Sequence, residues 1–291
     1  MRPFRFGVNM TSFEDRATWV ATCRRAEEMG YDVVLVPDHL GMPAPFPALA
    51  AAADATERVR LGTFVLNAGF WNPTLLAREV ATLDQISGGR FELGLGTGYN
   101  RAEFDAADLP FGSPGERVSA LEELVERLDA ALADGTPKPA QQPRPPLLLG
   151  GNGDRMLRLA ARRADTVAFA GARLKPGSTT GELLLLTAEE LDGRIALAVE
   201  AAGERDPERN LLVQVVAVVD DRRAAIEQLR AQFGVDYLTV EQMLELPTLL
   251  VGTVDEIAEQ LRAARERFGI SYVTVLQPSA EAFAPVIEKL R

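Results

Sequence analysis

The chain contains a single histidine, His39, and an aspartate, Asp38, stands directly before it. Imidazole changes its protonation state near neutral pH more readily than any other side chain, so it suits proton transfer in catalysis. Neighbouring residues of a regular strand face opposite ways, but Pro37 interrupts the strand just before this pair. We therefore predict Asp38 and His39 as catalytic residues, one facing the site and the other supporting it. The alternative is a histidine that only bonds a nearby backbone carbonyl.

A second candidate is the glycine-rich segment Gly150-Gly151-Asn152-Gly153, which joins an apolar run to a helix-like run. Glycine lets a backbone approach a ligand closely, and the free N–H groups at a helix N-terminus bind phosphate. Arg155 and Arg158 could add positive charge. The segment therefore favours a phosphate site, and the same pattern is also typical of a tight turn beside surface arginines.

Composition excludes several classes of protein. One Cys and one His in 291 residues are too few for a Cys- and His-rich zinc site, so we predict no metal. The 31 Lys+Arg and 42 Asp+Glu give a net charge of −11, which argues against binding nucleic acid or an anionic membrane surface. There is no run of about 18 apolar residues and no signal peptide. Because one Cys permits no internal disulfide, we expect a cytoplasmic protein.

The candidate residues need elements to position them, and eight apolar runs alternate with helix-like segments. Alternating strands and helices indicate right-handed crossovers and a parallel sheet. Eight such units in a chain of this length predict an α/β fold of the TIM-barrel type, a (β/α)₈ barrel forming a single domain over residues 1–291. The predicted strands are 4–10, 32–36, 59–66, 91–95, 146–149, 166–169, 211–219 and 271–276.

Barrels of this kind build their active sites at the carboxyl ends of the strands. The predicted strands end on polar or glycine-rich residues, which would gather at one rim of the barrel. In chain order these ends are Asn9, 38–39, Asn67, 97–100, 150–153, 170–171 and Gln277. The one histidine therefore lies where the fold predicts chemistry.

Several motifs resemble the luciferase-like monooxygenase superfamily. They are residues 26–32 leading to 37–40, residues 58–63, and residues 145–151. The most specific is Ser-Gly-Gly-Arg-Phe-Glu-Leu-Gly-Leu-Gly-Thr-Gly-Tyr at 87–99. The resemblance spans nearly the whole chain, weakens around 100–115, 173–189 and 236–247, and is strongest to the coenzyme F420-dependent oxidoreductase branch.

The resemblance implies a barrel that binds the deazaflavin F420, or alternatively FMN, across the strand ends. Asp38 and His39 would then lie beside the reactive ring edge. In the deazaflavin branch, the third strand carries a non-prolyl cis peptide bond against the ring, which falls here on Phe64-Val65. The cofactor-binding residues that we expect are Asn9, Phe64, Val65, Asn67, Gly98, Tyr99, Gly150, Gly151, Asn152 and Gly171.

The implied activity is hydride transfer between F420 and a small organic substrate, with His39 supplying or accepting the proton. One alternative is a two-component monooxygenase that receives reduced FMN from a partner reductase. Another is a redox-free isomerase or aldolase that acts through Asp38 and His39 on a phosphorylated substrate bound at residues 150–153. A third is a barrel that binds flavin without catalysis. Relatives are usually homodimers, so we expect a homodimer.

Two positions depart from the family pattern. Relatives that oxidise sugar phosphates have a Glu where this chain has Tyr99, so their substrate does not carry over. Trp71 stands where many relatives have a basic residue, which makes that corner of the pocket more apolar. The chain is also shorter than many relatives, so we expect only a small insertion over the barrel mouth.

Overall fold

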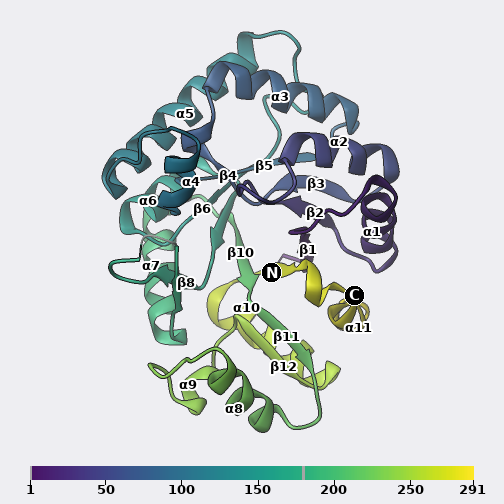
Figure 1. The fold of residues 1–291 in the computed structure, drawn as a ribbon, viewed down its shortest axis with the longest axis vertical. Helices are drawn as coiled ribbons and strands as arrows, with labels where there is room; N and C mark the ends of the chain where they lie inside the picture. The colour runs from purple at the N-terminus through teal and green to yellow at the C-terminus, as the bar shows by residue number, and fades with distance from the viewer. Residues whose placement is uncertain (1, 179–180) are drawn as a thin grey trace.

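The protein is a closed barrel of parallel strands surrounded by helices (Figure 1). The computed structural model describes residues 2–178 and 181–291. The strands follow one another in the order β3-β2-β1-β13-β10-β7-β6-β5-β4, and pairing of β3 with β5 closes the ring. Their bounds are β1 (Arg5–Asn9), β2 (Val33–Val36), β3 (Arg60–Thr63), β4 (Leu66–Asn67), β5 (Phe91–Gly96), β6 (Leu147–Gly150), β7 (Thr166–Phe169), β10 (Glu208–Val213) and β13 (Tyr272–Leu276). The predicted (β/α)₈ barrel is confirmed.

Helices cover the outside of the barrel, where the outward side chains of the strands form the main hydrophobic core. They are α1 (Arg16–Glu28), α2 (Pro45–Ala55), η1 (Ala68–Phe70), α3 (Pro73–Ile86), α4 (Arg101–Ala106), α5 (Pro114–Asp134), α6 (Asp154–Arg163), α7 (Ala188–Ala202), α10 (Val254–Phe268), η2 (Gln277–Ser279) and α11 (Ala280–Leu290). Helix α10 has the capping box of Thr253 and Glu256 and ends at Gly269, which has a φ of 67°.

The first helix, α1, begins at Arg16 and not directly after the end of β1. Residue Ser12 suggests an N-cap, but the cap is Asp15, whose carboxylate accepts a hydrogen bond from the backbone N–H of Thr18. The cause lies at the far end of the chain: Gln277 Oε1 accepts hydrogen bonds from the backbone N–H groups of Thr11 and Ser12 at 2.9 and 3.0 Å. These bonds occupy the N–H groups of the loop after β1 and tie it to the end of β13.

The predicted third strand, 59–66, is interrupted in the middle. It forms β3 and β4, and a cis peptide bond joins Phe64 to Val65 between them. The cis bond implied by the family resemblance is therefore present. The Thr63 side chain bridges the break, because its hydroxyl donates to Gly94 O at 2.8 Å and accepts from Gly94 N at 2.9 Å.

The predicted seventh strand, 211–219, is also divided. Strand β10 stays in the barrel, whereas β11 (Val215–Val218) pairs in parallel with β12 (Leu249–Gly252) outside it. With α8 (Arg222–Gln232) and α9 (Val240–Leu244), these strands enclose a second hydrophobic core (Figure 1). A separate antiparallel pair, β8 (Ala172–Leu174) and β9 (Leu183–Leu185), follows β7. The β8–β9 pair and helix α9 lie where the family resemblance is weak, whereas β11, α8 and β12 lie outside those regions.

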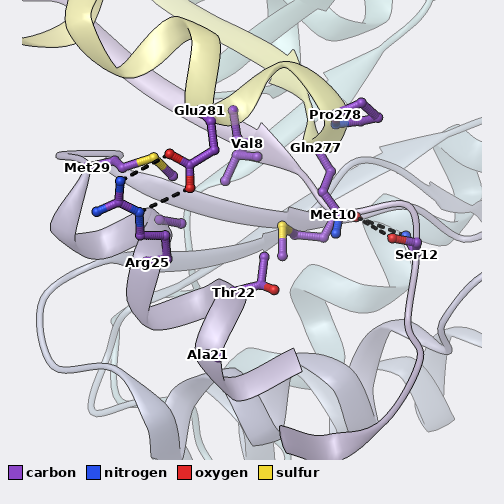
Figure 2. A pocket seen from close by; sticks show the side chains of 12 residues that line it. Val8, Met10, Ser12, Ala21, Thr22, Arg25, Met29, Gln277, Pro278 and Glu281 are labelled. Carbon is purple, nitrogen blue, oxygen red and sulfur yellow. Dashed lines mark hydrogen bonds and ion pairs between the residues drawn. The ribbon is translucent and has the colours of Figure 1, made fainter. Parts of the chain in front are cut away.

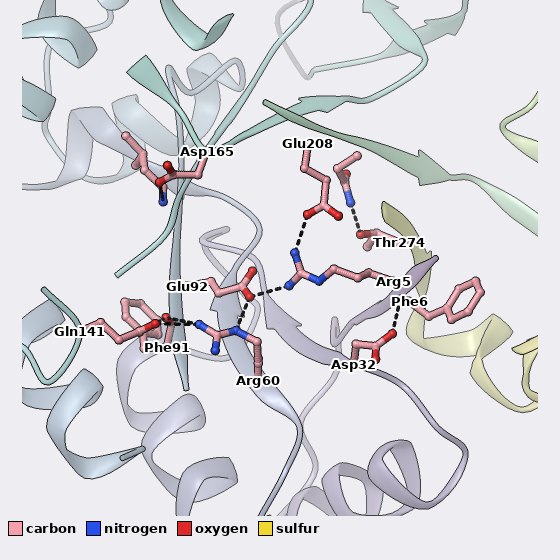
Figure 3. A network of polar contacts seen from close by, with 12 residues as sticks. Arg5, Phe6, Asp32, Arg60, Phe91, Glu92, Gln141, Asp165, Glu208 and Thr274 are labelled. Atoms are coloured by element: carbon pink, nitrogen blue, oxygen red, sulfur yellow. Dashed lines mark hydrogen bonds and ion pairs between the residues drawn. The ribbon is translucent and has the colours of Figure 1, made fainter. Parts of the chain in front are cut away.

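The amino-terminal floor of the barrel is closed by ion pairs (Figure 3). Arg5 binds Glu92 and Glu208, with both N–O distances at 2.5 Å, and Arg60 also binds Glu92. Burial alone would lower the pKa of Arg5, but the nearby Glu92 and Glu208 carboxylates raise it. The charged floor thus occupies one end of the barrel and leaves the opposite mouth for ligands.

Candidate active site

Asp38 follows β2 at the barrel mouth, and its carboxylate is bonded to neighbouring protein groups. Its Oδ2 accepts hydrogen bonds from the indole Nε1 of Trp71 at 2.8 Å and from the backbone N–H of Asn67 at 3.1 Å. Burial raises the pKa of the Asp38 carboxyl, while the bonds from Trp71 and Asn67 act in the opposite direction. Asp38 therefore fixes the turn from β4 into η1, next to the mouth. Trp71, which we predicted to make this corner more apolar, supplies a hydrogen-bond donor here.

His39 points to a different partner. Its Nδ1 lies 2.8 Å from Oε1 of Glu103, whose side chain is only 12% exposed. The ring of Tyr99 meets the imidazole edge-on, with centroids 5.7 Å apart. Burial raises the pKa of the Tyr99 phenol, and the nearby Glu103 carboxylate adds to this effect. The imidazole thus contacts one partly buried carboxylate and one aromatic ring at the mouth.

Glu103 is a site residue that the sequence did not reveal. It lies in the first turn of α4, three positions after Asn100, which caps that helix by accepting a hydrogen bond from Ala102 N. The contact joins residues 64 positions apart. An Asn followed by Glu at capping-box spacing was the available signal, and it points to a helix start rather than to His39.

Asn67 and Gly98 meet where β4 and β5 end. Asn67 is 5% exposed, and its Oδ1 accepts a hydrogen bond from Gly69 N at 3.1 Å. Gly98 has a φ of 68°, and a Cβ atom there would collide with Asn67 Oδ1. The close approach therefore requires glycine. Two predicted cofactor residues are brought together here.

The interior face beneath the mouth is apolar and comes from the divided third strand. Phe64 belongs to the cluster of barrel-interior side chains, and Val65 packs against it. A Cβ atom at Gly96 would lie 2.7 Å from Val65, and one at Gly150 would lie 3.5 Å from it. The Val65 side chain thus leans over the glycine ends of β5 and β6, and so forms an apolar shelf in the barrel interior below the predicted ring site.

The segment at Gly150–Asn152 leads into α6, as predicted. Its N-cap, Gly153, makes no side-chain capping bond, so no side chain caps the first N–H groups of α6. The predicted Arg155 instead bonds Gly115 O at 2.9 Å and pairs with Glu122, both on α5. We did not predict Arg194 of α7 from the sequence. Its Nη1 lies 3.5 Å from Asn152 O, and its guanidinium pairs with Asp154.

Two amides at the predicted site have a buried oxygen without a partner. Asn9 is 5% exposed and continues the inward-facing row of Arg5 and Gly7, and its Oδ1 has no hydrogen-bond partner. Asn152 donates to Ala172 O, but its Oδ1 is likewise buried and unpaired. An unpaired buried acceptor costs about 1–3 kcal/mol, and a ligand group that donates a hydrogen bond to it would remove that cost. Gly171, with a φ of 61°, instead packs against Thr248.

Two clefts lie beside the barrel mouth rather than within it. A cleft of about 490 Å³ runs between α1 and α11, and the Arg25–Glu281 ion pair lies on its wall (Figure 2). A second, of about 480 Å³, lies between η1 and α5 and reaches Trp71 and Thr97. Neither is lined by His39 or Asp38. The candidate active site is therefore identified by the polar side chains at the mouth and not by the size of a cavity.

Residues 2–178 and 181–291 contain neither a cluster of metal-ligand side chains nor a helix suited to crossing a membrane. No group of three or more His, Cys, Asp or Glu side chains in these ranges could hold a metal ion. No helix in the same ranges is both long enough and apolar enough to cross a membrane.

The model of the family described as luciferase-like monooxygenase matches residues 2–243. The chain therefore belongs to the luciferase-like monooxygenase family, and the prediction from its motifs is confirmed.

The individual proteins that resemble this chain include F420-dependent enzymes and a protein in complex with FMN. An F420-dependent glucose-6-phosphate dehydrogenase of Nakamurella multipartita is 30% identical over 253 residues, covering 78% of this chain and 72% of the relative. A solved F420-dependent secondary alcohol dehydrogenase, in complex with an F420–acetone adduct, has a TM-score of 0.77 at 20% identity, covering 99% and 98% of the two chains. The oxygenating constituent of 3,6-diketocamphane monooxygenase of Pseudomonas putida, in complex with FMN, has a TM-score of 0.71 at 17% identity, covering 99% and 96%. At these identities the two structures show the shared fold alone.

Proposed function

We propose that the protein is an oxidoreductase that uses coenzyme F420 for hydride transfer to or from a small organic substrate. The observation that carries the chemistry is His39, a proton-transfer group held by Glu103 at the carboxyl end of the barrel. The choice of cofactor is supported by the F420-dependent relative that aligns with 78% of this chain.

The residues at the mouth fit a flavin-like cofactor. The apolar Val65 shelf suits a flat ring, and the unpaired Asn9 Oδ1 and the amide of Asn67 suit its polar edge. The Gly150–Asn152 segment and the N-terminus of α6, with no side-chain cap, suit a phosphate. When bound, the deazaflavin supplies the carbon that gives or takes the hydride. The protein would orient the reactants and move the matching proton at His39.

The substrate is a small organic molecule placed against His39 and Tyr99. A glucose-6-phosphate dehydrogenase is among the relatives, but this chain has Tyr99 where the family resemblance implies a Glu in enzymes that oxidise sugar phosphates. We therefore do not transfer that substrate. A cytoplasmic location is supported by the single cysteine. A homodimer is the usual assembly in the resembling family, and a monomer in sedimentation analysis would remove that proposal.

A two-component FMN monooxygenase is the second candidate, because an FMN complex shares the fold. In that case a partner reductase would supply the reduced flavin. The mouth would hold the flavin in the same place, so the geometry alone favours neither cofactor.

Turnover assays separate these functions. We expect oxidation of reduced F420 with carbonyl substrates, or reduction of oxidised F420 with alcohols, in an anaerobic panel. His39→Ala should lower kcat by about 10²–10⁴-fold, as expected for loss of a general acid–base group. Turnover that needs reduced FMN and oxygen would support the second candidate. Turnover without any flavin would support an isomerase or aldolase, and cofactor that binds but is never oxidised or reduced would support a non-catalytic protein.

A further inference from the structure

Glu103 is the only side chain that the structure shows bonded to His39 within residues 2–178 and 181–291. The carboxylate side chain is 12% exposed and the imidazole 28%, so neither is free in solvent. The 2.8 Å distance between Nδ1 and Oε1 is that of a charge-assisted hydrogen bond.

The partner determines which ring nitrogen carries hydrogen. An ionised carboxylate only accepts hydrogen bonds, so Nδ1 must be the donor. In the neutral imidazole the other nitrogen, Nε2, then has no hydrogen and presents a lone pair. Nε2 is therefore the atom that can exchange a proton with a substrate.

A second contact holds the carboxylate in place. Asn100 Nδ2 donates to the same Glu103 Oε1 at 3.1 Å. Asn100 is itself fixed, because its Oδ1 caps α4 by accepting from Ala102 N at 3.2 Å. Oε1 thus receives two donors, one from the ring and one from the helix cap. The start of α4 and the end of β2 are linked through this oxygen.

We propose that Glu103 is the positioning residue of His39, keeping the neutral ring protonated at Nδ1 so that Nε2 faces the reacting substrate. The catalytic part of this inference rests on the proposed function; the ring state does not. When a substrate alcohol is oxidised, its carbon gives a hydride with both electrons to the deazaflavin, and its hydroxyl proton passes to Nε2. In the reverse reaction the imidazolium returns that proton from Nε2 to the carbonyl oxygen.

The single histidine makes the ring state directly measurable. Protein labelled with ¹⁵N only in histidine gives one pair of ring-nitrogen signals, both from His39. At a pH where the ring is neutral, we expect wild type to carry hydrogen on Nδ1 alone. Hydrogen on Nε2 in the wild-type protein would overturn the proposal, whether or not the protein uses F420.

Variants separate positioning from a merely structural role in α4. Glu103→Ala should abolish the preference for Nδ1–H, whereas Glu103→Gln should preserve it, because Asn100 Nδ2 keeps the amide oxygen of the new side chain turned toward the ring. Asp105→Ala is the matched control, since Asp105 lies on the same helix and pairs with exposed Arg101. The control should leave both ring signals unchanged. A Glu103→Ala protein that is folded and still carries hydrogen on Nδ1 alone would contradict the proposal.

Kinetics give the second readout. Misplacing a reacting group by about 1 Å can cost about 10²-fold in rate, so Glu103→Ala should lower kcat by about 10–10²-fold. The double variant with His39→Ala should be no slower than His39→Ala alone, because residues that act as a unit are not additive. A further loss in the double variant would show that Glu103 acts independently of His39.

Discussion

Asp38 and His39 are neighbours in the chain but lie in different electrostatic environments. Asp38 accepts two hydrogen bonds from the β4–α3 segment, while His39 bonds a carboxylate on α4. The sequence predicted that one of the two faces the mouth and the other supports it, without saying which. The contacts favour Asp38 as the supporting residue and His39 as the residue that exchanges the proton.

The raised pKa of Asp38 gives a pH dependence of stability. The native chain holds this proton to higher pH than the unfolded chain, whose Asp pKa is about 3.9. The contribution of the protonated carboxyl to stability is therefore complete below that value and is lost as the pH rises through the native pKa. Asp38→Asn has no ionisable group at this position and therefore avoids this loss. The unfolding free energy of the variant relative to that of wild type should rise from acidic to neutral pH. Urea unfolding across that range measures the difference.

Exposed Asp105 provides the control for this measurement, because Asp105→Asn removes a carboxylate that is not buried. The control should show no pH-dependent gain over wild type. A difference between Asp38→Asn and wild type that stays constant from acidic to neutral pH would contradict the assignment.

Gly98 tests the close packing at the mouth. An alanine there would hold a φ of 68° and drive its Cβ into Asn67 Oδ1. We expect Gly98→Ala to lower the unfolding free energy by about 1–3 kcal/mol and to weaken F420 binding. Gly193→Ala on α7 is the control: nothing lies within 4 Å of its Cβ, and helical alanine should stabilise by about 0.5–1 kcal/mol. Wild-type F420 affinity in Gly98→Ala would show that the Asn67 contact is not part of the cofactor site.

Strands β1, β5 and β10 carry the charged floor that closes the barrel opposite the mouth. Breaking a buried ion pair costs about 3–5 kcal/mol, but after Glu92→Ala Arg5 keeps Glu208 and Arg60 keeps Gln141. We therefore expect Glu92→Ala to lower the unfolding free energy by about 2–4 kcal/mol in urea titrations. Glu123→Ala, which breaks an exposed pair with Arg127, should cost about 1 kcal/mol or less. Equal losses in the two variants would show that the floor adds no special stability.

Local pattern was enough to predict most elements, and long-range contacts explain where it failed. Most strands of the barrel contain short apolar runs, and Thr253, Glu256 and Gly269 mark the ends of helix α10. The breaks at 64–65 and at Gln214 interrupt equally apolar runs, so no local signal marks them. Strand β12 was missed because its partner is the detached β11.

The site residues, like the elements, could be predicted where local pattern determines them and not where long-range contacts do. The fold places strand ends at one rim, so His39, Asn67 and Gly98 could be predicted from strand order. Glu103 and Arg194 could not, because each acts across a contact between distant segments: 64 positions to His39 and 42 to Asn152. The charge of Arg155 was visible in the sequence, but its direction toward α5 was not.

The molecule combines one barrel with a smaller lobe of β11, β12, α8 and α9 (Figure 1). Strand β11 contacts α11, β13 and η2, so the lobe packs on the barrel next to its carboxyl-terminal segments. This arrangement is consistent with one domain, which stays a prediction. The charged floor stabilises one end of the barrel, and the polar, glycine-rich mouth at the other end carries the candidate active site.

Cofactor choice is the central claim, and equilibrium binding tests it most directly. Protein freed of ligand would be titrated separately with F420 and with FMN, following the fluorescence of each cofactor. We expect F420 to bind at least about tenfold more tightly than FMN, a difference of about 1.4 kcal/mol. Tight binding of FMN with no binding of F420 would contradict the account and make the protein an FMN-dependent monooxygenase.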